Sequence, residues 1–288
     1  MKQYPPIEIP EVSVVIPVYN EESCIGECII SLLAQDFVKV EIVVVDDGST
    51  DASAALAASL GAVVLKGAHK GPGAARNAGA RAASGNILVL VDADMTFAPD
   101  YVSRLVLPIV KGGAAATCHW NEMVANWDNP WARCQTWFLG SPDGRRQPAE
   151  APEKENVYRA VRKDFFLTSG GFAEDEGRGD DASVSRRTGV FAVIVPDAGC
   201  FHRNATGPGE VFEDALWRGR DMAAAKERRL ARCAAAFFLY HNPIPVLFRG
   251  LRLGLLKKEP RLPVYSLVFS AGFLSGLVLA LITGQYQK

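Results

Sequence analysis

The chain has 288 residues, of which 49% are hydrophobic and 22% are charged, a balance that excludes an intrinsically disordered or collagen-like protein. With 31 Lys and Arg against 32 Asp and Glu, the formal net charge is −1, which argues against a nucleic-acid-binding protein because such proteins usually carry a basic excess. A chain of this length can bury a large core without disulfide bonds, as one large domain or as one domain with an appendage.

Six cysteines are spread along the chain, and no two of them form a Cys-x-x-Cys pair. Zinc-ribbon and thioredoxin-like sites therefore have no support, and we expect small buried thiols in a reducing, cytosolic environment. Segment 1–11 is short, polar and proline-rich, so no signal peptide is expected. The cysteines are Cys24, Cys28, Cys118, Cys134, Cys200 and Cys233.

The first third of the chain alternates between short Val/Ile/Leu runs and segments with helical spacing. The runs predict buried strands at 12–17, 40–45, 62–66 and 86–91. The segments between them predict helices at 22–35, 52–60 and 73–83. This repetition predicts an α/β fold with a mostly parallel central sheet and helices on both faces. Ligands of such sheets bind at the carboxyl ends of the strands.

The middle of the chain is less regular. Four of the five tryptophans lie in 117–139, where they would stack on a sugar, lie at a protein–membrane junction or pack in the core. Segment 141–156 is proline-rich and charged, which predicts a mobile loop. We expect order again at 158–166 and a further strand at 190–195.

The segment 264–283 contains no charged residue and has the length that crosses a hydrocarbon core. A buried core helix is the alternative interpretation. A basic cluster precedes the segment and predicts that this side faces the cytoplasm. The cluster consists of Arg249, Arg252, Lys257, Lys258 and Arg261.

The stretch before this segment, 234–256, mixes apolar residues with arginines. It predicts one or two amphipathic helices on the membrane surface, broken near Pro243 and Pro245. We therefore expect a catalytic domain at 1–228, amphipathic interfacial helices at 229–260 and a C-terminal transmembrane helix at 261–288.

Polar residues follow three of the predicted strands. Segment 17–21 follows the first strand, 46–51 the second and 92–94 the fourth. Because the ends of parallel strands meet at one edge of a sheet, their carboxylates should converge there, and they would repel one another without a cation or hydrogen-bond donors. Segment 46–51 is also compatible with an ordinary turn followed by a helix cap.

Asp92 and Asp94 lie on the same side of an extended chain, directly after a buried strand. Two such oxygen ligands suit Mg²⁺ or Mn²⁺ with a phosphate completing the shell, although an Asp-x-Asp pair alone is a weak signal. Segment 71–77 (GPGAARN) opens a helix whose N-terminus, with Arg76, favours phosphate. It is not a dinucleotide fingerprint, because Arg76 replaces the last glycine and the loop follows the third strand.

Four motifs, in this order and spacing, resemble a family 2 glycosyltransferase with the GT-A fold: VSVVIPVYNEE, VVVDDGSTD, GPGAARNAGARAASG and ILVLVDADM. The likeness covers about the first hundred residues, and the weaker segment 169–187 (SGGFAEDEGRGDDASVSRR) is similar to the acceptor-side motif of that family. The resemblance implies a nucleotide-sugar donor and a divalent ion, Mg²⁺ or Mn²⁺, that bridges its diphosphate. It places donor contacts at Pro17, Tyr19, Glu21, Asp47, Arg76 and Asp92.

The same resemblance implies that Asp94 ligates the metal directly, whereas Asp92 contacts ribose, donor sugar or a metal-bound water. Many GT-A enzymes add a histidine to the metal shell from a late position, and His202 is the candidate here. A lone histidine is usually structural, so both interpretations stay open. His119 and His241 are weaker candidates.

The catalytic base of the family corresponds to Asp181, which forms an acidic pair with Asp180 and precedes a distal Arg187. Ser183 stands where the family has a further acidic residue, so this part of the match is less complete. A base is needed because the attacking hydroxyl must lose a proton, and direct displacement with a single base gives inversion at the anomeric carbon. A helix cap is the alternative role for Asp181.

Together these features predict an inverting, metal-dependent glycosyltransferase that moves a hexose from GDP-mannose or a UDP-hexose to a lipid-linked acceptor at the cytosolic membrane face. A soluble polysaccharide or other glycan is the alternative acceptor. An inert nucleotide-sugar-binding module that recruits a partner to membranes is a second class of function. A nicotinamide oxidoreductase is a third, although the glycine fingerprint is missing. No nucleic-acid partner is expected.

Overall fold

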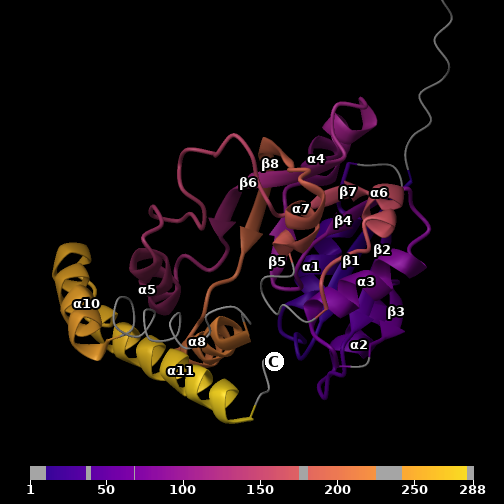
Figure 1. Ribbon diagram of the computed structural model, residues 1–288. Helices are drawn as coiled ribbons and strands as arrows, with labels where there is room; N and C mark the ends of the chain where they lie inside the picture. Colours follow the sequence, from indigo (N-terminus) through magenta and orange to yellow (C-terminus); the bar gives the residue numbers. More distant parts are fainter. Residues whose placement is uncertain (1–10, 37–39, 68, 175–180, 225–241, 284–288) are drawn as a thin grey trace, which may run out of the picture.

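The computed structural model describes residues 11–36, 40–67, 69–174, 181–224 and 242–283. In this part of the chain, eight strands form one sheet in the order β3-β2-β1-β4-β7-β6-β8-β5, and helices cover both of its faces (Figure 1). The predicted α/β fold with a central sheet is therefore confirmed. The five cysteines in these ranges are free and buried, as expected, and Cys233 lies outside the described residues.

The first half of the sheet is parallel. β1 (Val12–Val18) lies between β2 (Val40–Asp46) and β4 (Ile87–Leu90), and β3 (Val63–Lys66) pairs with β2. These are the four strands that the Val/Ile/Leu runs predict, and their carboxyl ends lie at one edge as expected.

The second half of the sheet is mixed. β7 (Ala160–Arg162) runs antiparallel to β4 and to β6 (Ala116–Val124), while β6 is parallel to β8 (Val193–His202). β5 (Met95–Phe97) pairs with β8 in the antiparallel sense.

The strand expected at 190–195 has the wrong boundaries, because β8 begins at Val193 and continues through Pro196 to His202. Proline lacks the N–H that a sheet requires and normally ends a central strand. Here the pairing of β6 with β8 shifts its register between His119 and Asn121, opposite Pro196, and this irregularity accommodates the proline. His202 consequently ends a strand instead of following one.

The two faces of the sheet bury separate cores. Val14 and Ile16 of β1 belong to the core under α1 and α4, whereas Val15 points to the opposite face and packs with residues of α3, α6 and α7. The helices of this part are α1 (Ile25–Leu33), α2 (Ser53–Ser59), α3 (Pro72–Ala82), α4 (Tyr101–Val110), α6 (Lys163–Thr168) and α7 (Ser183–Thr188).

Two glycines determine how α3 approaches the sheet. Gly71 precedes the helix with a φ of 87°, a conformation that other residues rarely adopt. A Cβ at Gly79 would lie 2.4 Å from Cγ1 of Val15, so only glycine allows α3 to pack this closely on β1. This packing carries Arg76 to the carboxyl edge of the sheet.

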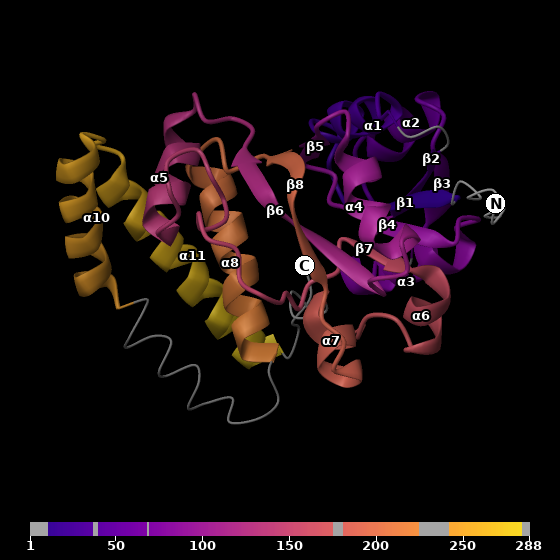
Figure 2. The ribbon, with the colours of Figure 1, turned by 90° about the horizontal axis from the view of Figure 1, so that it is seen from above.

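A layer of helices lies beyond the β6–β8 half of the sheet (Figure 2). Within the described residues, a third apolar core, separate from the two cores of the sheet, joins α5 (Pro130–Leu139), α8 (Pro208–Ala224), α10 (Pro243–Lys257) and α11 (Leu262–Thr283). Trp131 and Trp137 of α5 pack against this core. These two tryptophans thus pack against the helical layer, which is one of the three environments that the sequence allowed.

The C-terminal predictions have different outcomes. The apolar segment forms α11, which is long and apolar enough to cross a membrane, yet one of its faces is buried against other helices. Crossing of a membrane by 261–288 stays a prediction. α10 begins at Pro243, with the Asn242 side chain accepting a hydrogen bond from the Ile244 N–H, and it continues through Pro245, so the helix is not broken at that proline. Residues 225–241, on which a break near Pro243 depends, lie outside the described residues. The boundary at 228/229 lies outside the described residues.

Candidate active site

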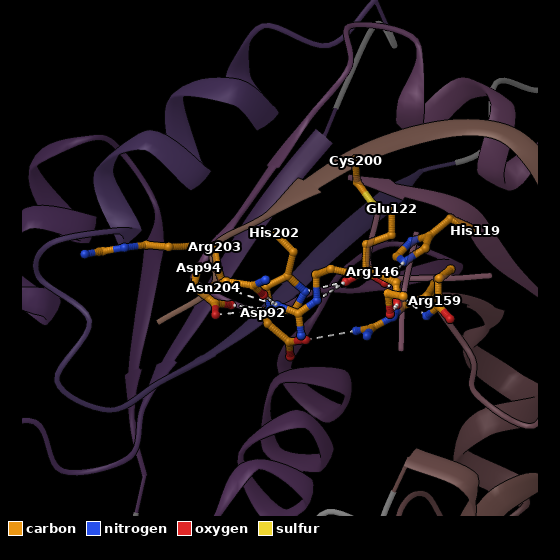
Figure 3. Close-up of polar contacts among 12 residues, drawn as sticks. Asp92, Asp94, His119, Glu122, Arg146, Arg159, Cys200, His202, Arg203 and Asn204 are labelled. Carbon is orange, nitrogen blue, oxygen red and sulfur yellow. Dashed lines mark hydrogen bonds and ion pairs between the residues drawn. The ribbon is translucent and has the colours of Figure 1, made fainter. Parts of the chain in front are cut away.

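Two arginines hold Asp92 just beyond the end of β4, and Figure 3 shows one of them, Arg159. Arg76 donates from Nη2 to Oδ1 of Asp92 at 2.6 Å and from Nη1 to Oδ1 of Asp181 at 2.9 Å. Arg159 donates from Nη1 to the other oxygen of Asp92 at 3.2 Å. Three of the predicted site residues, which are far apart in sequence, are therefore joined by one buried guanidinium, that of Arg76.

This pairing determines the charge of Asp92. Burial raises the pKa of Asp92, but Arg159 and Arg76 outweigh burial and hold the pKa well below its usual value. Burial lowers the pKa of Arg159, and the neighbouring Asp92 and Asp181 carboxylates raise it again, well above its usual value. Asp92 is thus ionised throughout the physiological pH range, which suits an acceptor of hydrogen bonds and not a group that exchanges protons.

Asp94 contacts the end of β8. Nε2 of His202 lies 3.1 Å from Oδ2 of Asp94, and its Nδ1 lies 2.5 Å from Oε1 of Glu122 (Figure 3). Burial lowers the pKa of His202, but the Asp94 carboxylate, opposed by Arg146, raises it to about 9. At neutral pH the imidazole is therefore protonated, and its single positive charge lies between the carboxylates of Asp94 and Glu122.

The Asp94–His202 pair fits a divalent cation. Two adjacent ligands of one octahedral ion, each about 2.1 Å from the metal, lie roughly 3 Å apart, and the facing atoms of Asp94 and His202 are 3.1 Å apart. Glu122 bonds the second ring nitrogen, which is the arrangement that orients metal-binding histidines. Among the described residues, no group of three or more His, Cys, Asp or Glu side chains is placed to hold a metal alone. Metal ligation by Asp94 and His202 stays a prediction.

Glu122 is the centre of a buried polar network on β6. Its carboxylate lies 3.2 Å from Nε of Arg146, 3.2 Å from Nε2 of Gln147 and 3.6 Å from Nε2 of His119. His119 in turn lies 2.9 Å from the Tyr101 hydroxyl. The weaker metal candidate His119 therefore contacts Glu122, which stands between it and His202.

Asp47 and Tyr19, two of the residues predicted to contact the donor, form a second group beside the N-terminus of α3. The Asp47 carboxylate accepts hydrogen bonds from the backbone N–H groups of Lys70 at 3.1 Å and Gly71 at 2.7 Å. The Tyr19 ring packs against the His69 ring with 4.6 Å between centroids and an angle of 38° between the ring planes, and His69 Nδ1 lies 2.8 Å from the Asp47 carbonyl oxygen. Donor contacts by these residues, Pro17 and Glu21 stay predictions.

The turn interpretation of 46–51 is correct for two of its acids. Asp46 accepts a hydrogen bond from the Ser49 N–H at 2.9 Å, and Asp51 accepts one from the Ser53 N–H at 3.0 Å. Asp47 has neither role, because it binds the loop that leads into α3. The sequence could not assign these three acids separately.

The helix-cap interpretation of Asp181 is wrong. The N-cap of α7 is Ala182, without a side-chain cap, and Asp181 pairs with Arg76 instead. Asn77 of α3 bonds both the N–H and the carbonyl of Phe172, at 2.9 Å each, and so ties the acceptor-side motif to α3. Asp180 and His241 lie outside the described residues.

Four residues of the site were not predicted from the sequence: His69, Glu122, Arg146 and Arg159. Arg159 stands next to β7 in the apolar run VYRAV, and a single charge there is a signal of a buried ion pair. Arg146 carries no such signal, since 141–156 has no periodicity. That segment is free of helix and strand, as expected, but Arg146 anchors it to Glu122 and to the Asn204 side chain at 2.9 Å.

Comparison with known proteins places this geometry in a family. The model of glycosyl transferase family 2 matches residues 13–168, more than half of the chain. The protein belongs to this family.

Two curated relatives illustrate the match. The succinoglycan biosynthesis protein ExoO of Rhizobium meliloti is 41% identical over 111 residues, which is 37% of this chain and 32% of that protein. The undecaprenyl-phosphate 4-deoxy-4-formamido-L-arabinose transferase of Pseudomonas fluorescens is 38% identical over 125 residues, or 39% of this chain and 35% of that protein. The chain thus matches about a third of the length of each of these relatives.

Solved structures agree with the fold over nearly the whole chain. The mannosyltransferase PcManGT from Pyrobaculum calidifontis, solved in complex with GDP-Man and Mn²⁺, has a TM-score of 0.59 and 20% sequence identity. The similarity covers 96% of this chain and 89% of that one. The GT-A fold predicted from the four motifs is therefore confirmed.

Proposed function

We propose that this protein is an inverting, metal-dependent glycosyltransferase that transfers a hexose from a nucleotide sugar to a lipid-linked acceptor at the cytosolic face of a membrane. The observation that carries the proposal is the convergence of Asp92, Asp94, Arg76, Asp181 and His202 at one edge of the sheet. Family 2 membership supports the transfer reaction.

The donor side of the proposal rests on charge. Asp94 and His202 would hold Mg²⁺ or Mn²⁺, and such an ion would neutralise the negative charge that develops on the departing nucleoside diphosphate. The loop held by Asp47 and the Tyr19–His69 ring pair would face the nucleotide. The base and the sugar are open between GDP-mannose and UDP-hexoses, since matched structures were solved with GDP-Man and with UDP-GlcNAc.

The acceptor side rests on Asp181. Arg76 orients its carboxylate by an ion pair of 2.9 Å, and about a third of the Asp181 side chain is exposed to solvent. A carboxylate so placed can accept the proton of an attacking hydroxyl. Arg76, which pairs with both acids, holds the Asp181 carboxylate near Asp92. The name of the Pseudomonas relative, which acts on undecaprenyl phosphate, supports a lipid-linked acceptor.

A ligand screen tests this function. A nucleotide sugar that binds with Mn²⁺ should raise the thermal midpoint of the protein, because a bound ligand stabilises the folded state. The donor sugar should also be slowly hydrolysed to free sugar when no acceptor is present. Asp94→Asn should remove the metal dependence of both effects, whereas Asp197→Asn, an exposed carboxylate on β8, should leave them unchanged. Binding without any hydrolysis or transfer would instead identify an inert nucleotide-sugar-binding module.

A further inference from the structure

The C-terminal helix α11 has two unlike faces. One face is buried on α8 and α5, where Phe269, Phe273 and Leu277 enter the third core. The opposite face consists of exposed apolar residues at helical spacing. They are Val264, Leu267, Val278 and Ile282, which are 51%, 42%, 50% and 77% exposed.

The neighbouring helix α10 exposes a second apolar stripe. Its members recur at intervals of four, three and four residues, so they share one face of the helix. They are Ile244, Phe248, Leu251 and Leu255, which are 65%, 67%, 44% and 82% exposed. We call the two stripes together the apolar outer surface. The two helices form the layer farthest from β1–β4 (Figures 1 and 2).

α11 packs so closely on α8 that separating the two helices would break their backbone contacts and expose the third core. A Cβ at Gly272 would lie 2.4 Å from the Phe212 carbonyl oxygen, and one at Gly276 would lie 1.9 Å from that of Leu216. A Cβ at Gly219 of α8 would lie 2.0 Å from the Phe273 carbonyl oxygen. The backbones therefore touch through the middle of α11, and the small residues of α11 serve this internal contact.

This contact decides how α11 can meet a membrane. α8 carries Glu213 and an Asp214–Arg218 ion pair of 2.8 Å beside the same stretch of α11. If α11 crossed a bilayer, the middle of α8 would be drawn into the hydrocarbon with these charges, which is costly. A helix that exposes only one apolar face can instead lie in the plane of the membrane.

We propose that the apolar outer surface of α10 and α11 seats the protein in one leaflet of an anionic membrane, with α11 in the membrane plane and both of its ends on the side of the catalytic domain. Charge complementarity selects this partner. Arg252 flanks the α10 stripe and Lys258 ends that helix, and within the described residues neither forms an ion pair with a carboxylate. Anionic headgroups attract such side chains.

Vesicle flotation of the full chain tests the surface. Vesicles of phosphatidylcholine with phosphatidylglycerol should carry the wild type, and Phe248→Glu with Leu255→Glu should reduce the bound fraction at least tenfold. The matched control is Ile30→Glu with Leu33→Glu, which changes two exposed apolar residues of α1, 57% and 59% exposed, and should float normally. Arg252→Ala with Lys258→Ala should weaken binding to anionic vesicles only. Normal flotation of the α10 variant, or a change limited to its oligomeric mass, would overturn the proposal.

Labelling decides between lying in the membrane and crossing it. Three variants carry a single new cysteine each, at Thr283, at Lys258 or at Lys111, all in a Cys233→Ser background. Lys111 lies on the catalytic domain and serves as the reference. An impermeant maleimide is then added to sealed membrane vesicles of either orientation. The proposal predicts that all three sites react from the same side. Reaction of position 283 from the opposite side to 258 would show that α11 crosses the membrane. The proposal extends the membrane attachment in the proposed function, but donor hydrolysis needs no membrane, so the two can fail separately.

Discussion

The two halves of the sheet supply opposite kinds of group to the candidate site. The parallel half, β1–β4, ends in the carboxylates Asp47, Asp92 and Asp94. The mixed half supplies groups that balance two of them, Arg159 beside β7 and His202 at the end of β8. Arg76 of α3 pairs with Asp92 from within the parallel half, but acids gathered at one edge repel one another, and the remaining cationic partners, Arg159 and His202, come from the mixed half. The contacts that join the halves are therefore also the contacts that build the site.

The largest effect is expected where the acceptor-side segment meets the parallel half. Asp181→Asn should lower turnover by about 10²- to 10⁴-fold, because the amide cannot accept the proton of the attacking hydroxyl. Nucleotide-sugar binding should stay nearly intact, since Arg76 still pairs with Asp92. Steady-state transfer rates and calorimetric donor binding measure the two quantities. Near-normal turnover would remove Asp181 from the role of base.

Removing a cation of the mixed half should destabilise the folded protein. Arg159→Met leaves Asp92 with one buried partner and should lower the free energy of unfolding by about 3–5 kcal/mol, as for other broken buried pairs. Arg162→Met, which breaks an exposed pair with Asp164, should leave it nearly unchanged, because solvent screens such a pair. Urea denaturation compares the two. Equal effects would mean that Asp92 does not depend on Arg159.

The contact between Asp94 of the parallel half and His202 of the mixed half should also determine metal affinity. Glu122→Gln should weaken Mn²⁺ binding by about 10- to 100-fold, because the amide no longer orients the His202 ring as the carboxylate does. His202→Ala should weaken it further, whereas Glu27→Gln, an exposed acid on α1, should have no effect. Titration calorimetry measures these affinities. An unchanged affinity in His202→Ala would make that histidine structural.

The smallest expected effect lies outside both halves, in the helical layer. Gly276→Ala forces α8 away from α11 and should lower the free energy of unfolding by about 1–3 kcal/mol. Gly207→Ala is the matched control, because a Cβ there meets nothing within 4 Å. If the two variants unfold alike, the close contact between these helices is not formed in solution.

The parallel half was predictable and the mixed half was not, for a physical reason. Each strand of β1–β4 is a short apolar run whose pairing follows from right-handed strand–helix–strand connections, so its end and the acids there could be located in the sequence. β8 crosses a proline that would normally end a strand, and only the register shift in its pairing with β6 lets it continue to His202.

The amino-acid sequence by itself determined the α/β class, the family, the converging acids and the apolar C-terminal helix, because these follow from periodicity and from motifs of neighbouring residues. The tertiary structure alone decided which partners neutralise those acids, since Arg159 lies beside β7 and His202 ends β8, and the pairing of these strands is not local. It also decided which face of α11 is buried. Hydrophobicity measures how apolar a helix is, but only the residues packed against it determine which side is left for a membrane.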